Sequence, residues 1–141
     1  MAYINFFNHN YPFKLPKPRK TTAWIRKVIV LEKKKLVQLN YIFCSDQYLL
    51  EINQKYLQHK SLTDIITFDN KEITGVIEGD VFISIERIKE NSFEWGTDLL
   101  EEVHRVLIHG VLHLVGYSDK TKQDKSMMRK KEDAYLSLRK N

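Results

Sequence analysis

The order in which apolar patterns follow one another along this chain restricts its fold more than any single residue does. In the first 85 residues, strand-like apolar segments are interleaved with segments of helical periodicity. Beyond residue 85 only helical patterns follow, with a break at Gly96. This order predicts an α/β (α+β) fold in which a mixed sheet of about four strands packs with about five helices.

Local signals indicate where these elements begin and end. We expect strands over residues 4–8, 38–44, 63–68 and 81–85. Helices are expected over residues 22–32, 47–57, 84–96, 98–115 and 122–139. An extended connector over residues 10–20 precedes the first helix, which Thr21 or Thr22 is expected to cap. Gly75 and Gly79 are expected in a polar, hairpin-like stretch before the fourth strand.

The length and apolar pattern of the chain indicate its general class. A chain of 141 residues is about one domain long, so we expect a single domain over residues 1–141. No apolar run approaches the roughly 20 residues of a membrane span, and the N-terminus lacks the features of a secretory signal. We therefore expect a cytoplasmic protein without a membrane partner. The single cysteine, Cys44, lies in an apolar segment and is expected to be buried and inert.

The chain is basic, with a formal net charge of +5 and a pI near 9.2. Its lysines and arginines cluster in residues 14–20, 33–35 and 120–131. A positive balance favours an acidic partner, and nucleic acid is the commonest partner of this kind. Any one cluster is also typical of a solvated helix face, so charge alone does not identify the partner.

The stretch over residues 109–119 has the spacing of a metal site. His109 and His113 are four residues apart on the expected long helix, which places their β-carbons about 5–6 Å apart. Gly116 is typical of a helix end, after which the chain can turn back and offer Asp119 as a third ligand. Asp124 is an alternative third ligand. Two imidazoles and a carboxylate suit zinc and leave its fourth position open, so we predict one Zn²⁺ per chain.

A helical wheel separates the two histidines from the apolar side of the long helix. The apolar arc consists of Leu100, Val103, Leu107, Val111 and Leu114. His109 and His113 lie at the edge of this arc, in the same sector as Glu102 and Arg105. This position is typical of a cleft wall, and it makes Glu102 a further alternative for the third ligand.

The spacing of these ligands also matches the metzincin proteases. In those enzymes His-Glu-x-x-His-x-x-Gly-x-x-His supplies three ligands and a glutamate that acts as general base. Gly110 occupies the position of that glutamate here. A metzincin-like metalloprotease is therefore an alternative function that the ligand spacing favours and Gly110 opposes.

Three motifs of the chain together match one known pattern. Residues 109–117 follow the signature His-Gly-x-Leu-His-Leu-x-Gly-Tyr. Residues 63–68, Thr-Asp-Ile-Ile-Thr-Phe, are similar to a second motif, Thr-Asp-Val-Leu-Ser-Phe, and residues 79–84, Gly-Asp-Val-Phe-Ile-Ser, to a third, Gly-Asp-Ile-x-Ile-Ser. With these motifs the chain resembles the YbeY family of bacterial ribosomal-RNA maturation endoribonucleases. The resemblance covers the whole chain in length and in the order of its motifs.

The resemblance implies a zinc-dependent, single-strand-specific endoribonuclease. Its expected roles are 16S ribosomal-RNA 3′-end maturation and ribosome quality control, with RNA and the ribosome as partners and no DNA. Zinc would polarise a phosphoryl oxygen and activate water. Glu102 is the candidate for the group that accepts the proton, with orientation of a histidine as its alternative role. A non-catalytic ribosome-assembly factor with a structural zinc is a third hypothesis.

The chain departs from the family pattern at two positions. Asp119 stands where the family has its third histidine ligand, and the anionic carboxylate would make zinc a weaker Lewis acid. Leu57 stands where the family usually has an arginine thought to serve the substrate. His59, Lys60 or Arg105 are candidates to bind substrate in its place.

Overall fold

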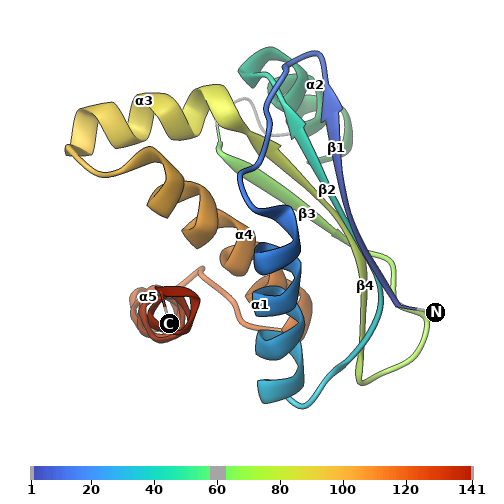
Figure 1. Cartoon of the computed structure of the whole chain (residues 1–141). Coiled ribbons are helices and arrows are strands. Elements are labelled where there is room, and N and C mark those ends of the chain that lie inside the picture. Colours follow the sequence, from blue (N-terminus) through green and yellow to red (C-terminus); the bar gives the residue numbers. More distant parts are fainter. Residues whose placement is uncertain (1, 58–62, 141) are drawn as a thin grey trace.

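Four strands and five helices make up residues 2–57 and 63–140, the part of the chain that the computed structural model describes (Figure 1). The strands are β1 (Tyr3–His9), β2 (Lys35–Cys44), β3 (Ile65–Asp69) and β4 (Val76–Ser84). The helices are α1 (Pro18–Leu31), α2 (Asp46–Leu57), α3 (Ile85–Trp95), α4 (Leu99–Val115) and α5 (Lys122–Lys140). The predicted number and order of elements are confirmed.

The strands form one mixed sheet in the order β1-β2-β4-β3. β1 and β4 both run parallel to β2, and β3 alone runs antiparallel to its neighbour β4. Crossover helices separate the parallel strands, and α1 provides the connection between β1 and β2. The predicted mixed sheet is therefore confirmed, and its antiparallel edge strand β3 lies next to the C-terminal helices.

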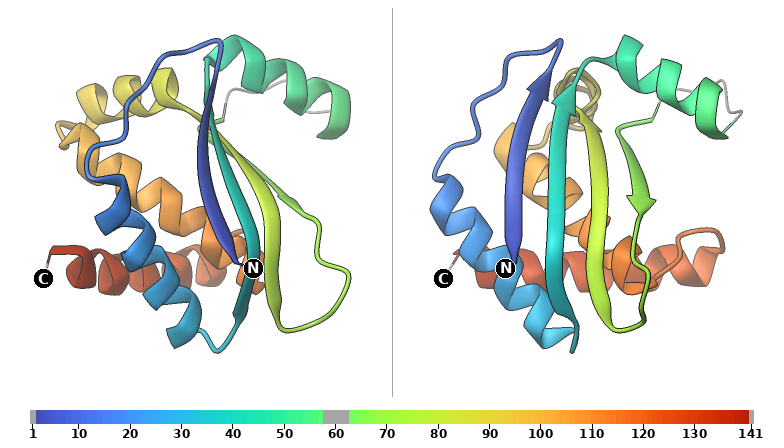
Figure 2. Two further views of the ribbon diagram at one scale, coloured as in Figure 1. Left: turned by 45° about the vertical axis from the view of Figure 1, so that its right-hand side comes forward. Right: turned by 90° about the vertical axis from the view of Figure 1, so that its right-hand side faces the viewer.

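The helices divide between the two faces of the sheet. Figure 2 shows α1, α4 and α5 on one face, while α2 lies at one end of the other face. Tyr41, Phe43 and Val81 point from the sheet into the larger core and are at most 1% exposed. The hydroxyl of Tyr41 donates to the carbonyl oxygen of Leu107 at 2.8 Å, which satisfies its polar end inside this core. A smaller apolar cluster joins α2 to the opposite face.

Two glycines allow α4 to approach the sheet closely. A β-carbon at Gly110 would lie 3.0 Å from Val81 Cγ1 and 3.3 Å from Ile65 Cδ1. A β-carbon at Gly79 would lie 2.5 Å from the Phe68 carbonyl oxygen and 2.9 Å from Leu114 Cδ2. Gly79 therefore leaves no room for a side chain, and at Gly110 the neighbouring side chains would have to shift to admit one.

The placement of Gly79 in a turn was wrong. Strand β4 begins at Val76, so Gly79 lies inside it and pairs with Leu39 of β2 and Asp69 of β3. Glycine inside a strand often marks a close approach of another element, and here that element is α4. Gly75, with a φ of +84°, does lie in the turn before β4.

The expected start of the first helix was also wrong. Helix α1 begins at Pro18, and Lys17 before it adopts a left-handed conformation with a φ of 47°. Proline suits the first position of a helix because its φ is already helical and its missing N–H needs no partner there. Thr21 lies inside the helix and is completely buried, so it caps nothing.

The expectation for Cys44 is confirmed. Its side chain is completely buried in the smaller cluster. Burial, with the charges of Asp46 and Glu86, raises the pKa of the thiol to about 12. A thiol that stays protonated is a poor nucleophile. Within the described residues, no helix is long and apolar enough to cross a membrane.

His104, on the α4 side opposite the two predicted ligands, makes folding depend on pH. It is 8% exposed, and burial, with the charge of Arg139, lowers its pKa to about 4. Between about pH 6.5 and pH 4, His104 binds a proton in the unfolded chain but stays neutral in the folded one, so the stability of the fold falls on acidification. We expect a loss of about 2 kcal/mol from this residue between pH 8 and pH 5.

The measurement is the free energy of unfolding of the wild type and of His104→Leu, followed in parallel between neutral and acidic pH. The leucine variant keeps the volume of the side chain and lacks the titrating group. Its stability should change less on acidification than that of the wild type. Equal pH dependence of the two proteins would contradict the role of His104.

Candidate metal centre

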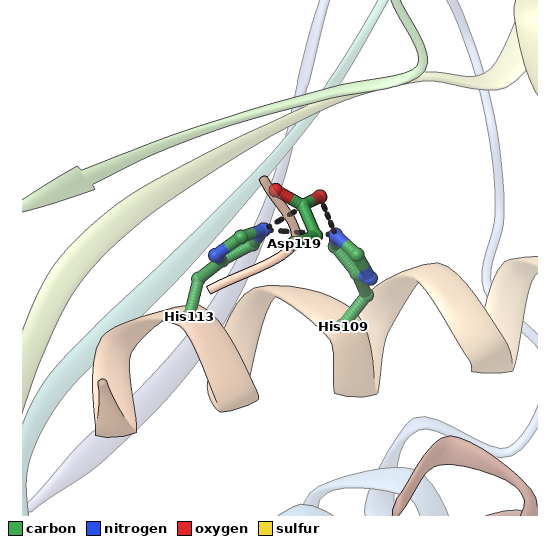
Figure 3. Close-up of side chains that lie close together, drawn as sticks. All are labelled: His109, His113 and Asp119. Carbon is green, nitrogen blue, oxygen red and sulfur yellow. Dashed lines mark hydrogen bonds and ion pairs between the residues drawn. The ribbon is translucent and has the colours of Figure 1, made fainter. Parts of the chain in front are cut away.

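Helix α4 and the turn after it bring the three predicted ligands together (Figure 3). His109 and His113 project from α4, and their Nε2 atoms lie 2.9 Å apart. Gly116, with a φ of +126°, ends the helix, and the chain turns back as expected. Oδ2 of Asp119 then lies 3.4 Å from each Nε2 atom. Three residues from two elements thus point three ligand atoms at one place.

Hydrogen bonds orient both imidazole rings. Nδ1 of His113 lies 3.1 Å from the carbonyl oxygen of Tyr117, and Nδ1 of His109 lies 2.6 Å from Oε2 of Glu132. Each oxygen accepts, so both Nδ1 atoms carry their proton and donate. The Nε2 atoms are consequently the ones left to bind a metal, as in many zinc sites.

The residues fit a divalent metal ion. Two Nε2 lone pairs that face each other repel unless a proton or a cation lies between them. Ligand atoms about 2.0–2.2 Å from a tetrahedral ion lie about 3.3–3.6 Å apart, and the two distances to Asp119 agree with this spacing. The shorter separation of the two nitrogens needs only a small rotation of either ring. The three-residue group can therefore hold a metal.

The electrostatics of the two histidines differ although they share the site. Burial lowers the pKa of His109, but the hydrogen bond and charge of Glu132 outweigh it, so the pKa is raised. Burial and the neighbouring charge of His109 lower the pKa of His113. A proton held between the facing nitrogens would compete with a metal ion, so metal binding displaces it.

Glu132 of α5 is a site residue that the sequence interpretation missed. It is 5% exposed, and its second oxygen, Oε1, accepts from Arg105 Nη1 at 2.9 Å. The available signal was its position on the apolar side of α5, between the buried Met128 and Leu136 at spacings of four residues. A carboxylate in such a position must have a charged or donating partner.

The turn that carries Asp119 is tied to two distant helices through Glu32, the residue that follows α1. The hydroxyl of Tyr117 donates to Glu32 Oε1 at 2.8 Å, and Tyr135 and Lys131 of α5 both donate to Oε2. Burial raises the pKa of Glu32, but these hydrogen bonds outweigh it and lower the pKa, so the carboxylate stays charged. The network holds the carbonyl group of Tyr117 where His113 can reach it.

Two of the three candidate ligands, His109 and Asp119, line a cavity of about 270 Å³ between the start of β3, the end of α3, α4 and α5. Its walls include Asp64, Ile65, Trp95, Glu102, Arg105, Val106, His109, Asp119, Lys125, Met128, Arg129 and Glu132. The cavity places the ligand atoms within reach of a molecule from solvent. It also brings Asp64, quoted above only as part of a motif, next to the predicted site.

The other predicted site residues have different positions. Glu102 lines the cavity, and its proposed role in catalysis stays a prediction. Arg105 lines it too, but its guanidinium is paired with Glu132 at 2.9 Å and Asp133 at 2.7 Å. His59 and Lys60 lie outside the described residues.

Replacing Glu132 with glutamine is expected to weaken metal binding about 10- to 100-fold. The neutral amide orients the His109 ring less firmly, and the negative charge next to this ring is lost. The measurement is a competitive titration with a chromophoric chelator. Asp133→Asn is the matched control, since Asp133 also pairs with Arg105 but does not touch a histidine. Equal affinities for the two variants would contradict the role of Glu132.

The fold and the site together define an α/β protein in which two histidines and one carboxylate form a group that could hold a metal ion beside a cavity. A family model described as Endoribonuclease YbeY matches residues 6–139. This chain belongs to the YbeY family.

Relatives agree over almost their full lengths. The protein named Endoribonuclease YbeY from Cytophaga hutchinsonii is 51% identical over 137 residues, which cover 97% of this chain and 96% of that one. The protein of the same name from Amoebophilus asiaticus is 49% identical over 135 residues, which cover 96% and 92%. The solution structure of TM1509 from Thermotoga maritima has the same fold, with a TM-score of 0.69 at 23% identity, covering 97% of this chain and 89% of that one.

Proposed function

We propose that this protein is a zinc-dependent endoribonuclease that hydrolyses phosphodiester bonds in single-stranded RNA. The observation that carries the proposal is the convergence of His109, His113 and Asp119 on one point at the wall of an open cavity. Three ligands leave a coordination position for water or substrate, which a structural zinc site lacks. The family name of the relatives supplies the class of substrate.

Each residue of the site has a proposed task. His109, His113 and Asp119 hold the ion, while Glu132 and the carbonyl group of Tyr117 keep the rings in the orientation that binds it. When bound, a divalent cation supplies Lewis acidity that favours attack of water on a phosphodiester. The remaining requirement is a group that accepts a proton from the attacking water.

Two carboxylates in the cavity are candidates for this proton acceptor. Glu102 lies on α4, two turns before His109, and remains our proposal. Asp64 is its rival, because burial raises the pKa of this carboxyl group toward the range of a general base. Glu102→Gln should lower kcat while metal content stays unchanged. A larger loss of kcat in Asp64→Asn would transfer the role to Asp64.

The biological setting of the activity is also a proposal. We propose that the whole chain acts as one domain in the cytoplasm, on the 3′ end of 16S ribosomal-RNA precursors, and with the ribosome as a partner in quality control. Support comes from the family and from the net charge of +5, which favours binding to RNA.

The function is tested by incubating the protein with single-stranded RNA, with the same RNA annealed to its complement, and with an unstructured peptide. The expected result is cleavage of the single strand, slow or no cleavage of the duplex, and an intact peptide. Cleavage of peptide but never of RNA would establish the metalloprotease alternative. Binding of RNA without cleavage of any substrate would favour an assembly factor with a structural zinc.

A further inference from the structure

A large aromatic side chain stands exposed at the rim of the metal-site cavity. Trp95 is the last residue of α3, and its side chain is 59% exposed. Gly96, with a φ of 68°, ends the helix immediately afterwards. The other tryptophan of the chain, Trp24, is only 5% exposed and donates its indole N–H to the Tyr135 carbonyl oxygen. Trp95 lines the same cavity as His109, so its exposed face borders the site.

Two exposed cations border the same cavity from α5. Lys125 and Arg129 are four residues apart, so they lie on the same side of the helix. Within the described chain, neither side chain has a hydrogen bond or an ion pair. Arg105 differs, because Glu132 and Asp133 neutralise its charge. The cations available to a ligand of this cavity are therefore those of Lys125 and Arg129.

The acidic residues of the cavity restrict what these cations can hold. Glu132 is paired with Arg105, and Asp119 faces the histidines, which leaves Asp64 and Glu102. These two carboxylates would repel a small free anion, and the attraction of the two cations would be its only favourable contact in the cavity. A ligand that also stacks on the indole gains a second, uncharged contact. A nucleotide unit of single-stranded RNA has both parts, a phosphate and a flat base.

We propose that Trp95, Lys125 and Arg129 form a nucleotide subsite beside the metal centre, an inference that rests on the proposed function. One unpaired base stacks on the indole of Trp95, and the two cations contact the phosphates that flank it. The cavity volume of about 270 Å³ lies just below the roughly 300–1,000 Å³ of pockets for drug-sized ligands, which suits a single nucleotide unit. Stacked, unpaired bases also give a physical reason for a preference for single strands.

Binding to a single-stranded phosphorothioate RNA of about 12 nucleotides tests the subsite, with the integrity of the RNA checked on a gel. Trp95→Ala should weaken binding about 5- to 150-fold, and Trp95→Phe should restore most of the affinity. Phe93→Ala is the matched control, because Phe93 is on the same helix and 90% exposed, but does not line this cavity. It should change affinity less than about twofold.

Two further measurements distinguish stacking from a general loss of affinity. RNA should quench the tryptophan fluorescence of the wild type, and Trp95→Phe should abolish this quenching because only the buried Trp24 remains. Lys125→Ala and Arg129→Ala should each reduce the slope of log Kd against log salt by about 0.7. Thermal melts confirm that all variants are folded.

The outcomes separate this inference from the proposed function. Unchanged affinity in Trp95→Ala, or an equal loss in Phe93→Ala, overturns the subsite even if the wild type cleaves RNA normally. Quenched fluorescence and the expected losses of affinity, without cleavage of unmodified RNA by the metal-loaded wild type, support the subsite and overturn the proposed function.

Discussion

Replacing His113 with alanine is expected to remove the bound metal and to lower the rate of RNA cleavage about a thousandfold or more. His113 supplies one of three ligand atoms, and its side chain is 26% exposed, so its loss opens no core cavity. The apolar side of α4 stays intact, and the variant should fold. Elemental analysis, a cleavage assay and a thermal melt measured on the same preparation check the three parts of this prediction.

His9→Ala is the matched control for this variant. His9 is an exposed histidine at the end of β1, and its ring contacts that of Tyr48 of α2 in a tilted arrangement. Its removal should leave metal content and cleavage unchanged. Full metal content in His113→Ala would show that the ligands have been chosen wrongly. A variant that loses metal and no longer folds would instead indicate a structural ion.

Separate variants test Asp119, because this residue replaces the third histidine of the family pattern. Its side chain comes from the turn after α4 and is 43% exposed, more than the side chain of either histidine. Asp119→Ala should lose metal, and Asp119→His should keep it, since imidazole binds zinc at a similar distance. Metal retained in Asp119→Ala would direct attention to Glu102 or Asp64, which line the same cavity.

Replacing Gly110 with glutamate is expected to prevent folding. This change restores the residue that a metzincin protease has beside its first histidine, but here the new β-carbon would lie 3.0 Å from Val81 Cγ1. The carboxylate would follow it into the apolar contact between α4 and the sheet. An unpaired buried charge costs several kcal/mol. This cost is comparable with the free energy of unfolding of a typical domain, about 5–15 kcal/mol. Soluble yield and circular dichroism check this outcome.

Met127→Glu is the control for adding a glutamate to a helix. Met127 lies on α5 and is 50% exposed, so its variant should fold normally. Gly110→Ala isolates the steric part, and we expect a loss of about 1–3 kcal/mol that shrinks when Val81 is also replaced by alanine. A folded Gly110→Glu protein that cleaves peptides would contradict this account and revive the protease hypothesis.

Several features of this protein were predictable from its sequence because they depend on neighbours along the chain. The spacing of His109 and His113 on one helix and the turn at Gly116 are local properties. They led to the ligand group that the structure brings together. The number and order of strands and helices were predictable for the same reason, since the periodicity of apolar residues reports which side of each element is buried.

Two predictions of local structure were wrong, one for a contact between distant elements and one for a local reason. Gly79 was predicted in a turn, but it lies in β4, where the side chain of Leu114 from α4 leaves no room for a β-carbon. The start of α1 was misplaced because a threonine is a common cap, whereas Pro18 and the left-handed Lys17 begin this helix. The contact at Gly79 leaves no periodic signal in the sequence, whereas Pro18 is a local signal for the start of a helix.

The sequence alone predicted the candidate ligands, their order and the family pattern, because a helix turn places residues four apart on one side wherever it occurs. Only the tertiary structure decided what surrounds them. Packing of α5 against α4 brings Glu132 to His109 and pairs it with Arg105, 27 residues apart in sequence. The same packing brings Lys125 and Arg129 to the cavity that Trp95 of α3 also lines. Such contacts arise because whole helices bury apolar surface against each other. This packing brings together side chains that are far apart in the sequence and whose proximity the local sequence pattern does not predict.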